Sequence, residues 1–118
     1  MRRLCYLWVA MLCLLGACGE KKTEVEDLQP DKLYFFYSNG CPHCHSALEY
    51  INQKYPKLSL SMVNVANAGG YELLVKCARK FKLGSQIGTP LLCMGDNYLM
   101  GWAPEYETKL DSYVKPYL

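Results

Sequence analysis

The sequence of 118 residues carries little excess charge: 13 Lys and Arg residues stand against 11 Asp and Glu residues, a formal net charge of +2. Two of the basic residues are Arg2 and Arg3, so a chain without its first residues carries 11 charges of each sign. Nucleic-acid binding relies on an excess of basic charge against the phosphate backbone. The composition therefore gives no electrostatic support for a nucleic-acid-binding protein.

Repeats and a complete set of metal ligands are also missing. The sequence has no internal repeat and no low-complexity tract, and its length suits one compact domain and no second one. Cys41, Cys44 and His45 would need a fourth ligand to hold zinc, and no second C-x-x-C motif or histidine pair supplies it. We therefore expect one domain with one site, and neither a metal nor an organic cofactor.

An apolar run near the N-terminus is typical of an export signal. Arg2 and Arg3 give a positive start, and residues 4–17 contain no charge. As a helix, this run of about 14 residues would be ~21 Å long, which is short of the ~30 Å hydrocarbon core of a bilayer. A cleaved signal peptide is therefore favoured over an uncleaved membrane helix.

The run ends in Leu15-Gly16-Ala17-Cys18, which resembles the lipobox of bacterial lipoproteins. The resemblance implies cleavage before Cys18 and acylation of this cysteine, which anchors the chain in a membrane because several acyl chains sit on one residue. Residues 1–17 are then the signal peptide, and the charge-rich residues 18–31 are the lipidated N-terminus and tether. We expect the domain, residues 32–118, to be held at the bacterial cell envelope, facing the periplasm or the cell exterior.

The seven cysteines divide between these segments. Cys5 and Cys13 leave with the signal peptide and Cys18 takes the lipid. The domain keeps an even number of thiols, which is compatible with two disulfides outside the cytoplasm: Cys41, Cys44, Cys77 and Cys93. For the last two, a disulfide and a pair of buried thiols that fill the core are equal alternatives. A Cα separation above ~7 Å would exclude the disulfide.

Hydrophobic periodicity along the domain predicts the order β-α-β-α-β-β-α, an α/β fold. The expected elements are a buried strand at 33–37, a helix at 42–55, a strand at 58–65, a helix at 71–81, a hairpin of 91–94 and 98–101 around Gly95-Asp96-Asn97, and a helix after Pro104. Pro42 suits the first turn of its helix, since the missing N–H would have no intrahelical partner there.

Cys41-Pro42-His43-Cys44 carries the clearest chemistry, because it lies where the first predicted strand meets the first predicted helix. Two thiols one helical turn apart can close a disulfide without moving the backbone. Cys41 lies at the positive end of the helix dipole, which favours its thiolate, so we expect Cys41 to be the nucleophile and Cys44 the resolving thiol. His43 adds a partial positive charge and a donor near that thiolate, which makes the disulfide a stronger oxidant.

Together with Gly88-Thr89-Pro90, this motif resembles the active site of the thioredoxin superfamily. The resemblance implies that Cys41 and Cys44 are the redox cysteines, that Pro90 is a cis-proline facing them, and that the backbone of Thr89 pairs with an extended substrate. It also implies a thioredoxin-like fold over essentially the whole domain, with a four-stranded mixed sheet flanked by helices. The tetrapeptide is that of DsbA-type oxidases, whereas Thr before the proline is more similar to DsbC-type isomerases.

Two departures from the family pattern narrow these expectations. The segment between Cys44 and Pro90 is too short for the helical domain that DsbA-type enzymes insert, so the chain is nearer a glutaredoxin-sized core. Thioredoxins place a buried Asp six residues before the first cysteine to take a proton from the resolving thiol, and Phe35 stands there instead. We therefore expect an oxidase or isomerase rather than a reductase, with envelope protein thiols and disulfides as substrates and an unidentified redox partner protein.

His45 leaves one alternative function open, because residues 41–45 also fit the C-x-x-C-H attachment sequence of c-type haem. Met62, Met94 or Met100 could then supply the second axial ligand of an electron-transfer haem protein. That alternative requires an all-helical fold, which the predicted strands do not favour. A redox-inert binding module, with a structural disulfide between the two cysteines, is a third interpretation.

The lipobox interpretation predicts that the mature protein begins at acylated Cys18. Mass spectrometry of protein extracted from the envelope should find the added lipid on an N-terminal fragment that starts with this residue, and the Cys18→Ala variant should lack it. Extracted protein that retains residues 1–17 would contradict the prediction.

Overall fold

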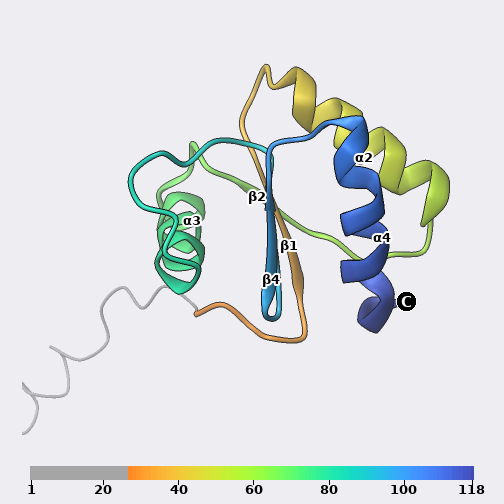
Figure 1. Ribbon diagram of the computed structural model, residues 1–118. Helices are drawn as coiled ribbons and strands as arrows, with labels where there is room; N and C mark the ends of the chain where they lie inside the picture. The colour runs from red at the N-terminus through yellow and green to blue at the C-terminus, as the bar shows by residue number, and fades with distance from the viewer. Residues whose placement is uncertain (1–26) are drawn as a thin grey trace, which may run out of the picture.

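The computed structural model describes residues 27–118, so the expected signal peptide, Cys18 and most of the tether lie outside the described residues. The described chain has the predicted order of elements (Figure 1): β1 (Leu33–Tyr37), α2 (Pro42–Lys54), β2 (Ser61–Asn64), α3 (Ala68–Lys80), β3 (Leu91–Met94), β4 (Asn97–Met100) and α4 (Glu107–Val114). Short 3-10 helices, Pro104–Tyr106 and Lys115–Tyr117, adjoin α4. None of the helices within the described range has the length and apolar character of a bilayer-spanning segment.

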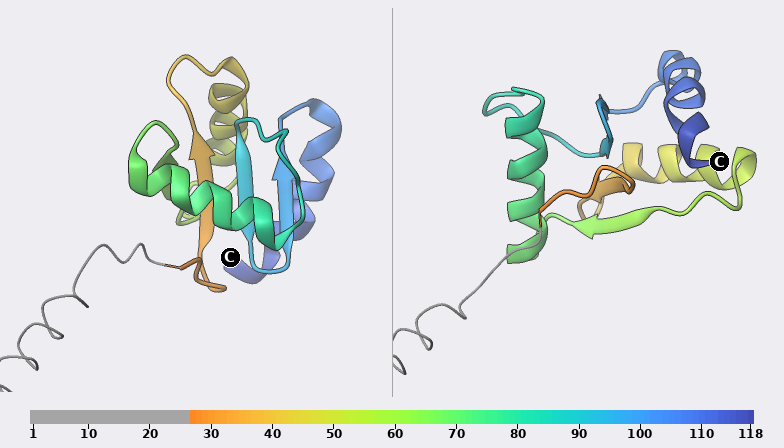
Figure 2. Two further views of the ribbon diagram at one scale, coloured as in Figure 1. Left: turned by 90° about the vertical axis from the view of Figure 1, so that its left-hand side faces the viewer. Right: turned by 90° about the horizontal axis from the view of Figure 1, so that it is seen from below.

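The strands form one mixed sheet in the order β2-β1-β3-β4. β1 runs parallel to β2 and antiparallel to β3, and β3 and β4 form the antiparallel hairpin. Helices α2 and α4 cover one face of this sheet and α3 covers the other, as the views in Figures 1 and 2 agree. The predicted α/β class with a four-stranded mixed sheet flanked by helices is confirmed.

β1 lies in the interior of the sheet and is covered on both faces. Successive side chains of a strand point to opposite faces, so Phe35 packs in the core under α2 and α4 while Tyr34 and Phe36 pack in the core under α3. Both phenylalanines have no exposed surface. A strand covered on both faces needs an apolar side chain at every position, which is why an uninterrupted aromatic and aliphatic run forms β1.

β2 is shorter than the predicted strand at 58–65. Only Ser61 to Asn64 pair with β1. Because β1 begins at Leu33, residues 58 and 59 have no residue of β1 opposite them in this register. Leu58 and Leu60 instead pack against the core under α2 and α4 from the loop that follows that helix. These leucines alternate with polar residues because only one side of the loop is buried. Such an alternation resembles the pattern of a half-buried strand.

α3 begins at Ala68, earlier than the predicted start at 71. Gly69 and Gly70 indicated a loop, but they form the first turn of the helix. Gly70 is buried against the end of β2, and a Cβ atom at this position would collide with the carbonyl oxygen of Asn64. The glycine therefore permits a close approach of helix and strand.

The β3–β4 hairpin turns on two residues, Gly95 and Asp96, because Met94 pairs directly with Asn97. Asn97, expected in the turn, is thus the first residue of β4. Gly95 has a φ of 57°, the positive value that two-residue hairpin turns require at their first position. The Nζ atom of Lys80 donates a hydrogen bond of 2.5 Å to the carbonyl oxygen of Gly95 and ties the end of α3 to this turn.

The end of the expected tether lies against the domain. The backbone N–H of Gln29 donates to the Oη atom of Tyr34 at 2.9 Å, and Leu28 packs against the core under α3. Asp27 forms an ion pair of 2.8 Å with Lys76 on that helix. Residues 27–31 are therefore docked on the domain. This part of the expected tether does not lengthen the link between the domain and the lipid expected at Cys18.

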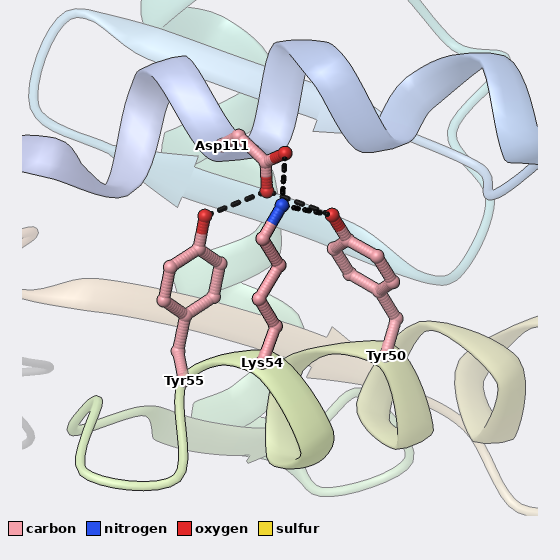
Figure 3. Close-up of polar contacts among 4 residues, drawn as sticks. All are labelled: Tyr50, Lys54, Tyr55 and Asp111. Carbon is pink, nitrogen blue, oxygen red and sulfur yellow. Dashed lines mark hydrogen bonds and ion pairs between the residues drawn. The ribbon is translucent and has the colours of Figure 1, made fainter.

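One carboxylate joins α4 to the C-terminal end of α2 (Figure 3). Asp111 accepts hydrogen bonds from the phenols of Tyr50 at 2.8 Å and Tyr55 at 2.6 Å, and pairs with Lys54 at 2.7 Å. Burial alone would raise the pKa of Asp111, but the hydrogen bonds from Lys54, Tyr55 and Tyr50 outweigh it and lower that pKa. Burial and the bond to Asp111 raise the pKa of Tyr55 to about 12. The carboxylate is thus ionised and the phenols are protonated at neutral pH.

We expect Asp111→Asn to lower the free energy of unfolding at neutral pH by about 1–2 kcal/mol, because a charged acceptor of three bonds is lost at a partly exposed site. The folded-state pKa of Asp111 lies below its ordinary value of 3.8. Its stabilisation is therefore complete above pH 3.8 and is lost as the pH falls through the folded-state pKa. Urea titrations should find that wild type and variant converge below that pH.

The control is Glu49→Gln, which removes an exposed carboxylate on α2, one of the two helices that Asp111 joins, and should change stability little. A stability difference between wild type and Asp111→Asn that does not depend on pH would contradict the assignment.

Candidate redox site

Cys41 lies at the N-terminus of α2, directly after the loop that leaves β1. Gly40 has a φ of 66°, a left-handed conformation that lets the chain turn into the helix. Cys41 is the N-cap residue and Pro42 occupies the first helical turn. The Sγ atom of Cys41 accepts the backbone N–H of Cys44 at 3.2 Å, a role that a Ser or Asp oxygen takes at other helix N-termini. A thiolate formed here is stabilised by that N–H and by the helix dipole.

Cys41 and Cys44 are bonded to each other, with their Cα atoms 5.2 Å apart. Cys41 retains 8% of its surface exposed and Cys44 retains 4%. Both belong to the core under α2 and α4, where Phe35 and Ala47 are fully buried. The pair therefore closes the edge of an apolar core, and Cys41 is its more accessible member.

The segment before β3 lies against this disulfide. The Thr89–Pro90 peptide bond is cis, and the Oγ1 atom of Thr89 donates to the Sγ atom of Cys41 at 3.6 Å. The hydroxyl oxygens of Ser38 and Thr89 are hydrogen-bonded at 2.8 Å. The structure thus brings together Cys41, Cys44, Thr89 and Pro90, from segments almost 50 residues apart in sequence.

The surroundings of Cys44 are apolar. Phe35, at the position where thioredoxins keep an aspartate, is fully buried in the same core. Across residues 27–118 no polar or charged side chain is buried. Cys44 therefore has no buried carboxylate beside it to accept a proton, and an apolar environment favours the protonated form of a thiol.

Both histidines of the chain lie exposed on the first turns of α2. His43 follows Cys41 by two residues and precedes Cys44 directly, so it sits on the solvent side of the redox pair. His45 comes one residue after the pair. The imidazole of His43 is therefore placed where its charge can act on Cys41 through solvent-exposed surface.

Cys77 and Cys93 are also bonded, and their Cα atoms are 6.5 Å apart, inside the limit for a disulfide. Of the two alternatives that the sequence left open, the structure has the disulfide. Cys77 has no exposed surface and Cys93 only 3%. This disulfide lies in the core under α3, on the opposite face of the sheet from the first one. It is closed to solvent, which suits a structural role.

The two metal-based alternatives find no support in the geometry. Among the described residues, no three His, Cys, Asp or Glu side chains gather around one point. Cys41 and Cys44 bond to each other, and the four-stranded sheet is not the all-helical fold that the haem alternative requires. Of the candidate axial ligands, Met94 is only 2% exposed in the core, while Met62 lies exposed on β2.

Ser38 and Asp111 were not among the residues predicted from the sequence to form a site. Serine and aspartate are common at surfaces, and neither lies in a motif. The hydrogen bond of Ser38 to Thr89 spans 51 residues and that of Asp111 to Tyr50 spans 61. Only the strand order and the position of α4 would have revealed them.

Comparison with known proteins gives matches in structure alone. No family model matches the sequence, and no curated protein matches it significantly. A glutaredoxin from Archaeoglobus fulgidus superposes with a TM-score of 0.54 at 18% identity, over 71% of this chain and 86% of that one. A mutant of a thioredoxin-like protein gives 0.53 at 19%, over 71% and 100%. Buckwheat glutaredoxin, solved in complex with glutathione, gives 0.50 at 16%, over 73% and 74%.

At these identities the likeness shows the fold. The chain has a thioredoxin-like fold, as the resemblance of its motifs predicted. Within that fold, a bonded Cys41–Cys44 pair at the start of a helix indicates a function in thiol redox chemistry.

The position of the two disulfides predicts separate roles. The double variant Cys77→Ala/Cys93→Ala should lower the free energy of unfolding by ~3 kcal/mol, the value for a closed loop of about 15 residues. Its Cys41–Cys44 redox potential should equal that of wild type, because the lost bond lies on the other face of the sheet. The control Cys41→Ser/Cys44→Ser opens a much shorter loop and should lose less stability. Free thiols at Cys77 and Cys93 in native, air-oxidised protein would contradict this assignment.

Proposed function

We propose that this protein is a lipid-anchored thiol-disulfide oxidoreductase of a bacterial cell envelope that exchanges disulfides with other proteins through Cys41 and Cys44. The observation that carries the proposal is the placement of the Cys41 Sγ atom. It accepts an N–H at the start of α2 and faces the cis Thr89–Pro90 bond. A sulfur in this position is both a good nucleophile and a good leaving group.

The exchange proceeds in two displacements on sulfur. A substrate thiolate attacks the Sγ atom of Cys41, the Cys41–Cys44 bond breaks, and Cys44 leaves as a thiolate that takes a proton from solvent. A second substrate thiolate then attacks the substrate sulfur of this mixed disulfide, and Cys41 leaves as a thiolate. The substrate dithiol loses two electrons and two protons. The protein gains the two electrons; one proton goes to Cys44, and the other goes to solvent while Cys41 remains a thiolate.

The apolar core around Cys44 supports oxidation or isomerisation over reduction. A reductase must deprotonate Cys44 so that it can attack the mixed disulfide on Cys41. Fully buried Phe35 provides no acceptor for that proton, and apolar surroundings raise a thiol pKa. In the oxidising direction a substrate thiol performs the second attack, so a protonated Cys44 is no obstacle. Mixed disulfides then have time to rearrange, as isomerisation requires.

An oxidising, extracytoplasmic compartment accords with the second disulfide. Buried structural disulfides such as Cys77–Cys93 persist outside the cytoplasm and are rare within it. The lipobox at Cys18 and the charge-free run before it point the same way. We propose that the domain works at the periplasmic or outer side of a membrane and that a separate redox protein restores its disulfide. The exchange requires no cofactor.

The decisive measurement is the equilibrium of the Cys41–Cys44 pair with a glutathione buffer. We expect a potential between about −200 and −120 mV, the oxidising end of the range for such proteins. His43→Leu removes the partial charge near the Cys41 thiolate and should make the potential more negative by ~30 mV for each unit by which the pKa of Cys41 rises.

His45→Leu is the matched control, because it removes an equally exposed histidine of the same helix that lies outside the redox pair, and it should leave the potential unchanged. A wild-type potential near ~−270 mV, the value of thioredoxin, would show that the protein is no oxidase. Equal potentials in wild type and His43→Leu would show that His43 does not tune the site.

A further inference from the structure

Ser38 occupies a position at the redox site that the proposed exchange does not yet use. β1 and β3 are antiparallel, and Phe36 pairs with Leu91 at the end of their ladder. Continued by two residues on each strand, this register sets Ser38 opposite Thr89. Their hydroxyl oxygens are 2.8 Å apart, and both residues are partly buried. The contact therefore follows from the pairing of the two strands.

The number of available protons gives this contact a direction. A threonine hydroxyl has one proton to donate, and that of Thr89 goes to the Sγ atom of Cys41 at 3.6 Å. The bond between the two hydroxyls is then donated by Ser38. The result is a chain of two hydrogen bonds that begins at Ser38, passes through Thr89 and ends on the sulfur of the nucleophile.

We propose that Ser38 is a positioning residue that holds the Thr89 hydroxyl with its proton toward Cys41 and so favours the thiolate form of the nucleophile. The inference rests on the proposed function and deepens it. A bond from a neutral hydroxyl to a thiolate is charge-assisted, and it strengthens when the donor itself accepts a hydrogen bond. Without Ser38, the Thr89 hydroxyl loses that donor and is free to rotate away from the sulfur.

Few other groups compete for control of the Cys41 sulfur. The Cys44 N–H donates to the same sulfur, but it belongs to the helix backbone. The core around the pair consists of apolar side chains and cysteines. At its margin, Tyr50 and Tyr55 bond to Asp111 at the C-terminal end of α2, the end of the helix opposite Cys41. On α2 the exposed His43 is the titratable neighbour within the motif. A change in the thiolate caused by Ser38 is therefore separable from these groups by mutation.

The test compares Ser38→Ala with Ser38→Thr in the full-length protein. Ser38→Ala should raise the pKa of Cys41 by about 0.3–0.5 unit, a ~2- to 3-fold lower thiolate fraction below that pKa. Ser38→Thr keeps the hydroxyl and should restore the wild-type value. The pKa is measured from the pH profile of alkylation at Cys41, identified by mass spectrometry. At a pH above the pKa of Cys41, where the reduced form is the thiolate, the glutathione equilibrium should shift ~2- to 3-fold toward the disulfide.

Thr89→Val tests whether the effect passes through Thr89. This variant should raise the pKa of Cys41 by about one unit, and adding Ser38→Ala to it should change nothing further. A matched control is Ser46→Ala, since Ser46 is exposed on α2 and donates to the carbonyl of Pro42 instead. It should leave the pKa of Cys41 unchanged.

Each outcome has a distinct meaning. An unchanged pKa of Cys41 in Ser38→Ala, or an equal shift from Ser38→Ala with and without Thr89→Val, would overturn the positioning role while exchange with glutathione continues. Failure of the wild-type pair to exchange with glutathione would overturn the proposed function itself. If Ser38→Ala does not fold, Thr89→Ser in comparison with Thr89→Val decides whether a hydroxyl at residue 89 is required.

Discussion

The antiparallel pairing of β1 with β3 is the constraint on which the redox site depends. Backbone hydrogen bonds hold the two central strands in one register, from Leu33 opposite Met94 to Phe36 opposite Leu91. The residues that follow β1 and those that precede β3 must then meet at the same end of the sheet. One of these segments leads to Cys41 and the other carries Thr89 and the cis bond. The strand pairing brings the sulfur and its hydroxyl neighbours together, and their own hydrogen bonds form at the end of the sheet that this pairing sets.

The two disulfides lie on opposite faces of the sheet. Phe35 faces the core that contains the Cys41–Cys44 pair, whereas Tyr34 and Phe36 face the core that contains Cys77–Cys93. One bond lies at the edge of its core and closes a short loop, and the other is buried and closes a longer one. A domain of this size buries a limited core, and a structural disulfide adds to its stability. The exchangeable bond can therefore open while the second face of the sheet stays cross-linked.

Side-chain contacts hold helix α2 at its C-terminal end, away from the two cysteines. Its N-terminal end carries the Cys41–Cys44 disulfide, the site of the proposed exchange. Its last turn, with the residue that follows it, presents Tyr50, Lys54 and Tyr55 to one carboxylate on α4. The Tyr50 ring also packs against Trp102, 5.5 Å between ring centroids. These contacts to α4 involve no atom of the Cys41–Cys44 disulfide and lie at the opposite end of α2.

The sequence alone was sufficient for features that depend on near neighbours: the aromatic run of β1, the apolar stripes of α2 and α3, the hairpin, and the C-x-x-C motif at a helix start. Periodicity and capping act over one or two turns, so a local pattern reports them. Where the predicted bounds of an element were wrong, contacts with an element distant in sequence were the reason. Gly70 lies in a helix that packs so closely against the end of β2 that only glycine fits there. Leu58 packs from a loop because β1 begins too late in the sequence to pair with it. Strand order, the Cys77–Cys93 bond, the Ser38–Thr89 contact and the cluster at Asp111 were decided by the tertiary structure, since each joins residues whose separation in sequence carries no signal until the sheet has formed.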